Sequence, residues 1–140
     1  MLAMSCMTVP FLAVAADGPW SEISVGGRAD AQRAQYDVMV VSIDGSMDFP
    51  DQPVYRFAPG RHGLLLGSLK RGPSGEMIAQ SLSVEMQPCT RYVLAADHSH
   101  PEPNRSWEPR MVGTEPIAKC MKKYAGQLSS TTAPVASNAP

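Results

Sequence analysis

The sequence predicts an all-β fold, a small antiparallel β-sandwich, from three observations. Short runs rich in β-branched and apolar residues recur at close spacing along the chain, which is typical of the strands of a sandwich. Thirteen prolines and eleven glycines divide the 140 residues into pieces that are too short for a helical bundle. A hydrophobic content of 44% supplies one core, and the length corresponds to one domain.

The first sixteen residues are interpreted as a signal peptide. No charged residue precedes Asp17, and the apolar run 1–16 ends in small residues, which is typical of a cleavage site after Ala15 or Ala16. A signal peptide normally opens with Lys or Arg, and a start codon assigned too far downstream would explain why this run has neither. Because the run is also shorter than the roughly 20 residues of a transmembrane helix, we expect export and no stable membrane span.

The rest of the chain is expected to hold one folded domain between two less ordered ends. Residues 17–35 are mixed and polar, and we expect a loosely structured lead-in there, in which Ile23 and Val25 allow a short strand and residues 28–35 allow one or two helical turns. Residues 36–126 carry the strand signals and form the predicted β-sandwich domain. Residues 127–140 contain no charged and no aromatic residue, which predicts a disordered tail.

Six strands are predicted within the domain. They span residues 36–45, 53–57, 62–71, 77–86, 90–97 and 106–112. The run 77–86 alternates apolar and polar residues, as a strand with one solvent-exposed face does. A turn is expected at Pro59-Gly60, because proline presets φ and glycine accepts the positive φ of a type II turn.

The end of the domain allows two readings. Pro109 marks 106–112 as an edge strand, since proline cannot donate to a sheet ladder. Residues 114–126 then form a short C-terminal helix, with Thr114 as N-cap and Gly126 as C-cap. Alternatively, the same segment begins as a strand that runs to Cys120.

Cys89 and Cys120 are predicted to form a disulfide. Cys6 lies in the segment removed on export, so the mature chain holds an even number of cysteines, and such a pair in an exported protein is typically oxidised. Closing a loop of about 32 residues stabilises a fold by roughly 3.5–4 kcal/mol. The pair lacks the ligand spacing of a zinc site.

One part of the chain resembles a known group of domains. Residues 40–66 contain, in order, V-V-S-I-D-G, P-V and F-A-P-G-R-H-G-L-L-L, which resembles PEGA-type domains and their small immunoglobulin-like or transthyretin-like relatives. The later Cys89-Thr-Arg-Tyr92, Trp107-x-Pro109 and Cys120 arrangement is similar to that of small exported proteins of Gram-negative bacteria. Over residues 36–120 the resemblance implies a sandwich that binds or scaffolds in the cell envelope, and it brings no catalytic residues with it.

The stretch AADHSHPEP, residues 95–103, is a candidate metal site. His98 and His100 are two positions apart, so on an extended segment both side chains project to the same side. Asp97 or Glu102 would add an oxygen ligand, and imidazole with carboxylate suits zinc, copper or nickel. The alternative is a solvated loop, because two prolines interrupt this polar run between two strands.

A second candidate site is a surface for a glycan or a peptide. Arg91, Tyr92, Trp107 and Arg110 would form an exposed aromatic and basic patch if all four side chains faced solvent. The alternative is that the two aromatic rings fill the core and the two arginines lie at its rim.

These observations predict an exported, periplasmic or secreted, non-enzymatic domain that binds or scaffolds an envelope protein or a glycan. The sequence contains no Gly-x-Ser-x-Gly motif and no Gly-Lys-Ser/Thr phosphate loop, and we expect no cofactor. A net charge of −1 argues against nucleic acid as a partner. Two alternatives stay open: a periplasmic metal-binding protein that uses His98 and His100, and a small hydrolase with an unrecognised site.

Overall fold

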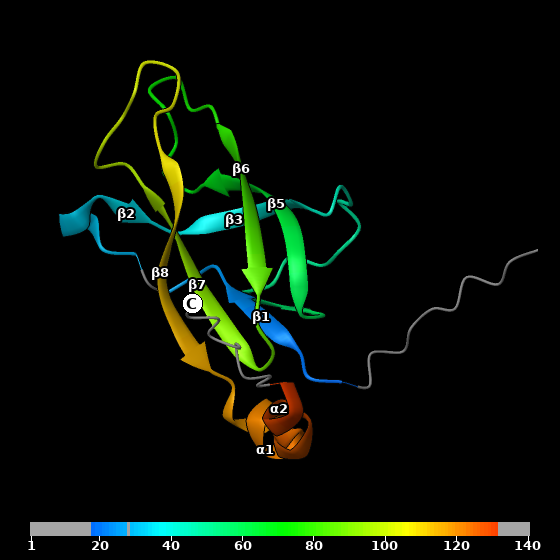
Figure 1. Ribbon diagram of the computed structural model, residues 1–140. Coiled ribbons are helices and arrows are strands. Elements are labelled where there is room, and N and C mark those ends of the chain that lie inside the picture. Colours follow the sequence, from blue (N-terminus) through cyan, green and yellow to red (C-terminus); the bar gives the residue numbers. More distant parts are fainter. Residues whose placement is uncertain (1–17, 28, 132–140) are drawn as a thin grey trace, which may run out of the picture.

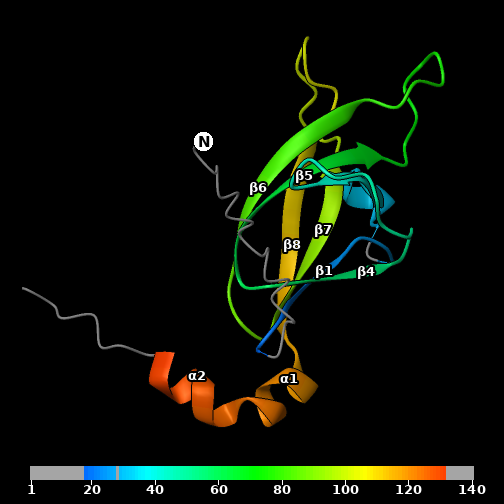
Figure 2. The ribbon, with the colours of Figure 1, turned by 90° about the vertical axis from the view of Figure 1, so that its right-hand side faces the viewer.

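The computed structural model describes residues 18–27 and 29–131, which form two β-sheets packed face to face (Figures 1 and 2). Two short helices follow the last strand at one end of the molecule. The predicted all-β sandwich with a short C-terminal helix is therefore confirmed. The expected signal peptide, residues 1–16, lies outside the described residues.

The two sheets draw their strands from alternating parts of the chain. The strands are β1 (Ser21–Ser24), β2 (Gln35–Tyr36), β3 (Val38–Ile43), β4 (Val54–Phe57), β5 (Gly60–Ser68), β6 (Ala79–Met86), β7 (Thr90–Asp97) and β8 (Glu108–Pro116). The first sheet has the order β2-β7-β1-β4, with β8 paired to β7 as well, and the second has the order β3-β5-β6. A short 3-10 helix, Ala31–Arg33, precedes β2. Each of the six expected strands is present, with bounds that differ by a few residues.

β6 has the expected solvent-exposed face. Val84 and Met86 are buried in the core, while Ser83 and Glu85, which alternate with them, are exposed. β6 pairs antiparallel with β5 along its whole length. The alternation of apolar and polar residues therefore reports the two faces of this strand directly.

The lead-in expected at residues 17–35 is instead an inner part of the sandwich. β1 pairs antiparallel with β4 and parallel with β7, so it lies between them in the first sheet. Ile23 is fully buried, and so is Ser21, whose hydroxyl donates to the Gln87 carbonyl at 2.6 Å. Four residues are too few to show a clear period, and the β7 partner lies far along the chain, so this strand gives no strong local signal. One consequence is that the first sheet is mixed and not wholly antiparallel.

The C-terminal end combines both readings of the sequence. β8 pairs with β7 alone among the described strands, so Pro109 does lie in an edge strand. The helix α1 (Ala118–Lys123) begins after Ile117, and Thr114 lies in β8 and does not cap it. The helix α2 (Ala125–Thr131) contains Gly126 and includes the first residues of the expected tail. Neither helix has the length and apolar character needed to cross a bilayer.

Two groups of buried side chains hold the fold together. The main core lies between the sheets and is built around fully buried residues such as Ile23, Leu66, Leu94 and Trp107. A second, smaller core lies where the helices meet the sandwich. It consists of Trp20, Cys89, Ile117 and Cys120, with Tyr124 and Leu128 packed against it.

The inner position of β1 predicts a large cost for shortening Ile23. In Ile23→Ala the free energy of unfolding should fall by about 2–5 kcal/mol, because the change leaves a cavity in the main core. Urea unfolding followed by fluorescence measures this loss. Ile78→Ala is the matched control, since Ile78 is 37% exposed, and it should cost less than about 1.5 kcal/mol. Equal losses in the two variants would contradict the placement of β1.

Candidate functional site

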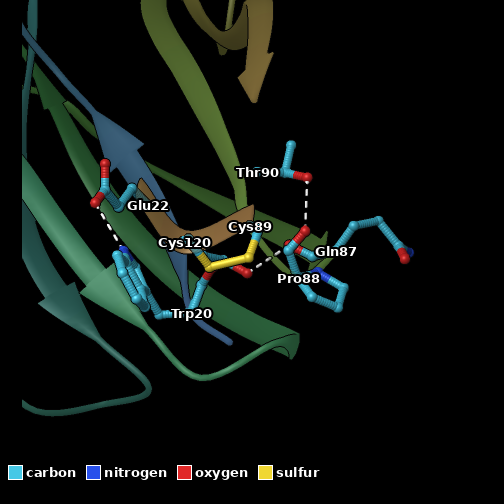
Figure 3. The surroundings of a disulfide bond; sticks show 8 residues. Trp20, Glu22, Gln87, Pro88, Cys89, Thr90 and Cys120 are labelled. Carbon is cyan, nitrogen blue, oxygen red and sulfur yellow. Dashed lines mark hydrogen bonds between the residues drawn. A yellow bond between two sulfur atoms is a disulfide. The ribbon is translucent and has the colours of Figure 1, made fainter. Parts of the chain in front are cut away.

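Cys89 and Cys120 form the predicted disulfide, which joins the entrance of β7 to α1 (Figure 3). Their Cα atoms are 5.3 Å apart. The Cys89 amide donates to the Trp20 carbonyl at 2.7 Å, and the Ile117 amide donates to the Cys89 carbonyl at 2.8 Å. These bonds hold Cys89 at a φ of 53°, a left-handed conformation that few residues with a side chain adopt. At this end of the molecule the disulfide and two backbone hydrogen bonds therefore connect the segment before β1, the start of β7 and the start of α1.

A buried carboxylate connects β1 to β7 next to the disulfide. Glu22 accepts a hydrogen bond from the Trp20 indole at 2.9 Å (Figure 3) and one from Arg91 Nε at 2.8 Å. Burial raises the pKa of Glu22, but these two hydrogen bonds and the charges of Arg91 and Arg56 outweigh it and hold the pKa below its ordinary value. Arg91, an expected surface residue, is thus committed to an internal ion pair, with Glu115 as a more distant partner at 3.8 Å.

The four residues of the expected aromatic and basic patch do not form one exposed surface. Tyr92 and Trp107 are both buried, so the alternative that the rings fill the core describes their positions. The Tyr92 hydroxyl accepts from the Gln87 amide at 2.8 Å, and the Trp107 indole donates to the Ile78 carbonyl at 2.9 Å. Arg110 is paired instead with Asp97 and Glu108, at 2.7 and 3.1 Å.

A cleft lies at the opposite end of the sandwich from the disulfide. It is bordered by the β5–β6 loop, residues 69–78, and the β7–β8 loop, residues 98–107, which project from the same end of the molecule (Figure 1). We call it the loop cleft, and its volume is about 410 Å³. Its lining residues are Lys70, Arg71, Gly72, Pro73, Ile78, His98, Pro101, Ser106 and Trp107. A volume of this size suits a small ligand.

His98 is held in the loop cleft by contacts from two strands, β2 and β5, and from the end of its own loop. Its Nε2 lies 2.7 Å from Oγ of the buried Ser68, and its ring stacks on Trp107 and meets Tyr36 edge-on. The Ser68 hydroxyl already accepts from the Lys70 amide at 3.2 Å, and its own proton needs an acceptor, for which Nε2 is the partner at hand. This assignment places the His98 proton on Nδ1. Nδ1 has no hydrogen-bond partner among the described residues. Because every buried side-chain nitrogen and oxygen in this part of the chain has a partner, Nδ1 is not buried and is open to solvent.

The residues of the candidate metal site are engaged separately. Asp97 is buried, accepts from the Ser99 amide and hydroxyl, and pairs with Arg110. The hydrogen bonds from Ser99 and the charge of Arg110 outweigh the effect of burial and lower the pKa of Asp97. His100 is exposed, and its Nδ1 lies 2.8 Å from the Ser99 hydroxyl. Within residues 18–27 and 29–131 no three His, Cys, Asp or Glu side chains are grouped as ligands for one ion.

The Asp-Gly and Pro-Gly-Arg-His segments of the sequence meet in space. His62 Nδ1 lies 2.7 Å from Asp44 Oδ2, and His62 Nε2 lies 2.7 Å from the Ala58 carbonyl. The other Asp44 oxygen accepts from the Gly63 amide at 2.8 Å. Burial lowers the pKa of His62, but its hydrogen bonds to Asp44 and Ala58 outweigh that effect and raise the pKa above 6.5. Two acceptors on one imidazole favour the imidazolium form of His62. The cluster links the two turns, and both ring nitrogens of His62 are engaged in it.

Among the lining residues that were not sequence candidates are Lys70, Arg71 and Ile78. They lie on both sides of the turn around Gly72 and Gly75, where Gly75 has a φ of 78° and its amide donates to the Gly72 carbonyl at 2.9 Å. The available signal was a pair of cations next to a glycine-rich turn, followed by an exposed isoleucine. That signal gains meaning only when the β7–β8 loop is placed beside it.

Comparison of the chain with protein-family models, with curated proteins and with solved structures finds no match. The resemblance of residues 36–120 to PEGA-type, immunoglobulin-like or transthyretin-like domains therefore stays a prediction. The assignment of a site rests on the geometry described above.

The His62–Asp44 pair predicts a pH-dependent contribution to stability. The folded state holds the His62 proton more tightly than the unfolded chain, so the contribution is complete below pH 6.5 and is lost as pH rises through the folded pKa. Between about pH 5.5 and about pH 8.5, His62→Gln should flatten this loss, and at the acidic end it should cost on the order of 1 kcal/mol.

Urea unfolding of both chains across this range measures the effect. His100→Gln, which changes an exposed histidine of the β7–β8 loop, is the matched control and should keep the wild-type slope. A slope that His62→Gln leaves unchanged would contradict the ionised pair.

Proposed function

We propose that this chain is an exported, non-enzymatic binding domain of the bacterial envelope, whose recognition site is the loop cleft. The observation that carries the proposal is the cleft itself, because loops from the two sheets border it and the strands that lead into these loops, β5 and β7, contribute Leu66 and Leu94 to the main core. Binding residues are commonly placed on loops that a rigid scaffold positions. An envelope protein or a glycan is the expected class of partner.

The chemistry of the cleft supports binding over catalysis. Its charged and ring nitrogen groups are hydrogen-bond donors, namely the Lys70 ammonium, the Arg71 guanidinium and Nδ1–H of His98, and the Ser106 hydroxyl can both donate and accept. No lining residue is an Asp or Glu, so the lining offers no carboxylate base to pair with His98. Donors around a partly apolar space are typical of a site that orients a ligand.

Export is supported by the disulfide and by the apolar start of the chain. Disulfides persist in oxidising compartments such as the periplasm and are rare in the cytosol. The bond between Cys89 and Cys120 lies in the small core that packs the helices against the sandwich. It stabilises the fold because the loop it closes restricts the unfolded chain. The uncharged run 1–16 with its small residues at Ala15 and Ala16 has the composition of a cleaved leader.

The metal-binding alternative has no comparable support. His98 is engaged with Ser68 and His100 with Ser99, and Asp97 is held by Ser99 and Arg110. It stays a prediction from the sequence, as does the hydrolase.

Export is tested by expressing the chain with a C-terminal tag in a Gram-negative host and weighing the periplasmic product. The expected mass corresponds to cleavage after Ala15 or Ala16 and to one disulfide. Leu2→Lys, which supplies the missing positive charge, should raise the exported fraction. Ala15→Leu combined with Ala16→Leu is the control and should block cleavage. An uncleaved product in the cytosol with two free thiols at Cys89 and Cys120 would refute export.

Binding is tested by screening envelope glycan fragments and short peptides against the isotope-labelled, oxidised chain by NMR. A genuine ligand should shift the Trp107 indole N–H signal in a saturable manner. Ile78→Glu, which changes the cleft wall, should lower the affinity for that ligand by about tenfold or more. Ser81→Glu, on the exposed face of β6, should leave binding unchanged. A ligand that binds both variants equally well would place recognition elsewhere on the molecule.

A further inference from the structure

We propose that the loop cleft recognises an anionic group, a carboxylate or a phosphate, carried on a small apolar body. This inference rests on the proposed binding function and names the class of ligand. It is built from the charge of the lining, from the free donors in it and from the apolar wall between them.

The lining concentrates positive charge in a chain that is slightly acidic overall. Lys70 and Arg71 both line the cleft, and no Asp or Glu does, whereas the whole chain has a net charge of −1. Neither cation forms an ion pair within the described residues, and the Glu76 carboxylate of the same loop lies against Gly72 and accepts from the Ser74 amide. Cations that line a concave site raise the local concentration of an anion. The cleft is therefore complementary in charge to an anion.

Arg71 is distinctive among the described arginines. Arg33, Arg61, Arg91, Arg105 and Arg110 each form an ion pair, and Arg56 lies over the Trp20 ring. Arg71 is exposed at the cleft and has no hydrogen bond, ion pair or ring contact within the described part of the chain. A planar guanidinium with free donors is the side chain best suited to bind a carboxylate or a phosphate in bidentate fashion.

Lys70 and His98 complete the donor set. The Lys70 ammonium lies 4.8 Å above the centre of the Tyr36 ring, and the Lys70 backbone amide is anchored to the Ser68 hydroxyl. The same hydroxyl fixes the tautomer of His98, which leaves Nδ1–H open to solvent. A cation, a guanidinium and an imidazole N–H thus meet in one cleft, and two of them are positioned by the buried Ser68.

The remaining lining is apolar and sets the second requirement of the ligand. Ile78 is 37% exposed, and Pro73 and Pro101 are exposed beside it. Burial of this surface against an apolar ligand would stabilise the complex through the hydrophobic effect. A free inorganic ion would leave it uncovered, so the structure favours an anion attached to a hydrocarbon or ring body.

The proposal is tested by NMR titration of the isotope-labelled, oxidised chain with four probes. Benzoate and phenyl phosphate carry an anion on an apolar ring, benzamide carries the ring alone, and inorganic phosphate carries the anion alone. Benzoate or phenyl phosphate should shift the Trp107 indole and His98 ring signals saturably. The affinity for at least one of these anions should be about tenfold higher than the affinity for benzamide. The stronger of these two probes identifies the anionic group as carboxylate or phosphate. Binding of either should weaken with added salt.

Two variants and a control locate the anion. Arg71→Met and Lys70→Met should each lower the affinity for the anionic probe by about tenfold or more and leave the affinity for benzamide unchanged. Arg61→Met removes an exposed arginine from β5 outside the cleft and should have no effect. Their amide spectra report whether each variant is folded.

His98 gives an independent readout through pH. Burial and the Lys70 charge lower the pKa of His98 below 6.5 against the opposing charge of Asp97. Asp97 is itself paired with Arg110, and Arg71 lines the same cleft. The other groups against the ring are the Ser68 hydroxyl and the aromatic rings of Tyr36 and Trp107. A bound anion favours the imidazolium, so benzoate should raise the pKa of His98 and bind more tightly as pH falls below 6.5.

Two results would overturn the inference. If benzamide binds as tightly as benzoate and Arg71→Met changes neither, the cleft remains a binding site but does not select an anion. If none of the four probes shifts the cleft signals, the anionic class is wrong, while the binding function is decided separately by the screen of glycans and peptides. A benzoate affinity that does not vary with pH would remove His98 from the donor set.

Discussion

Six consecutive residues of β7, Tyr92–Asp97, are buried, and this burial requires every backbone amide and carbonyl of the strand to find a partner inside the protein. β8 supplies partners along one edge, while β1 and β2 share the other edge. The short strand β1 is therefore necessary, because without it half of one β7 edge would be buried and unpaired. The position of β1 in turn brings Glu22 beside Arg91, and the cost of burying that carboxylate is offset by its two hydrogen bonds.

β7 also connects the two ends of the molecule that differ in character. It begins next to the disulfide at Cys89 and ends at Asp97, immediately before the loop that carries His98. The first end is closed by a covalent bond, a small core and two helices. The second end is open, with a cleft between two loops. Rigidity is thus concentrated below the site, and the residues that a ligand would meet lie on loops whose bases are fixed by Ser68 and Asp97.

Sequence reasoning succeeded where the signal was local and failed where it was not. The strands of β5, β6 and β7 follow from alternation and from long apolar runs, and the disulfide follows from counting cysteines. A short strand at Ile23 was allowed by the sequence, but the inner position of β1 was not predicted, because it depends on pairing with Arg91 and its neighbours, far along the chain. The loop cleft was missed for the same reason, since Lys70 and His98 are close only after both sheets have formed. Even the His62–Asp44 bond was visible in the sequence only as two turns, not as one cluster.

The parallel pairing of β1 with β7 also decides which way the molecule faces. Because the two strands run in the same direction, β1 starts beside the disulfide, so the first described residues and the helix α2 lie at the same end of the sandwich (Figures 1 and 2). Any tether attached before β1 or after α2 would hold the molecule by this end. The loop cleft would then lie at the end of the molecule farthest from the attachment point.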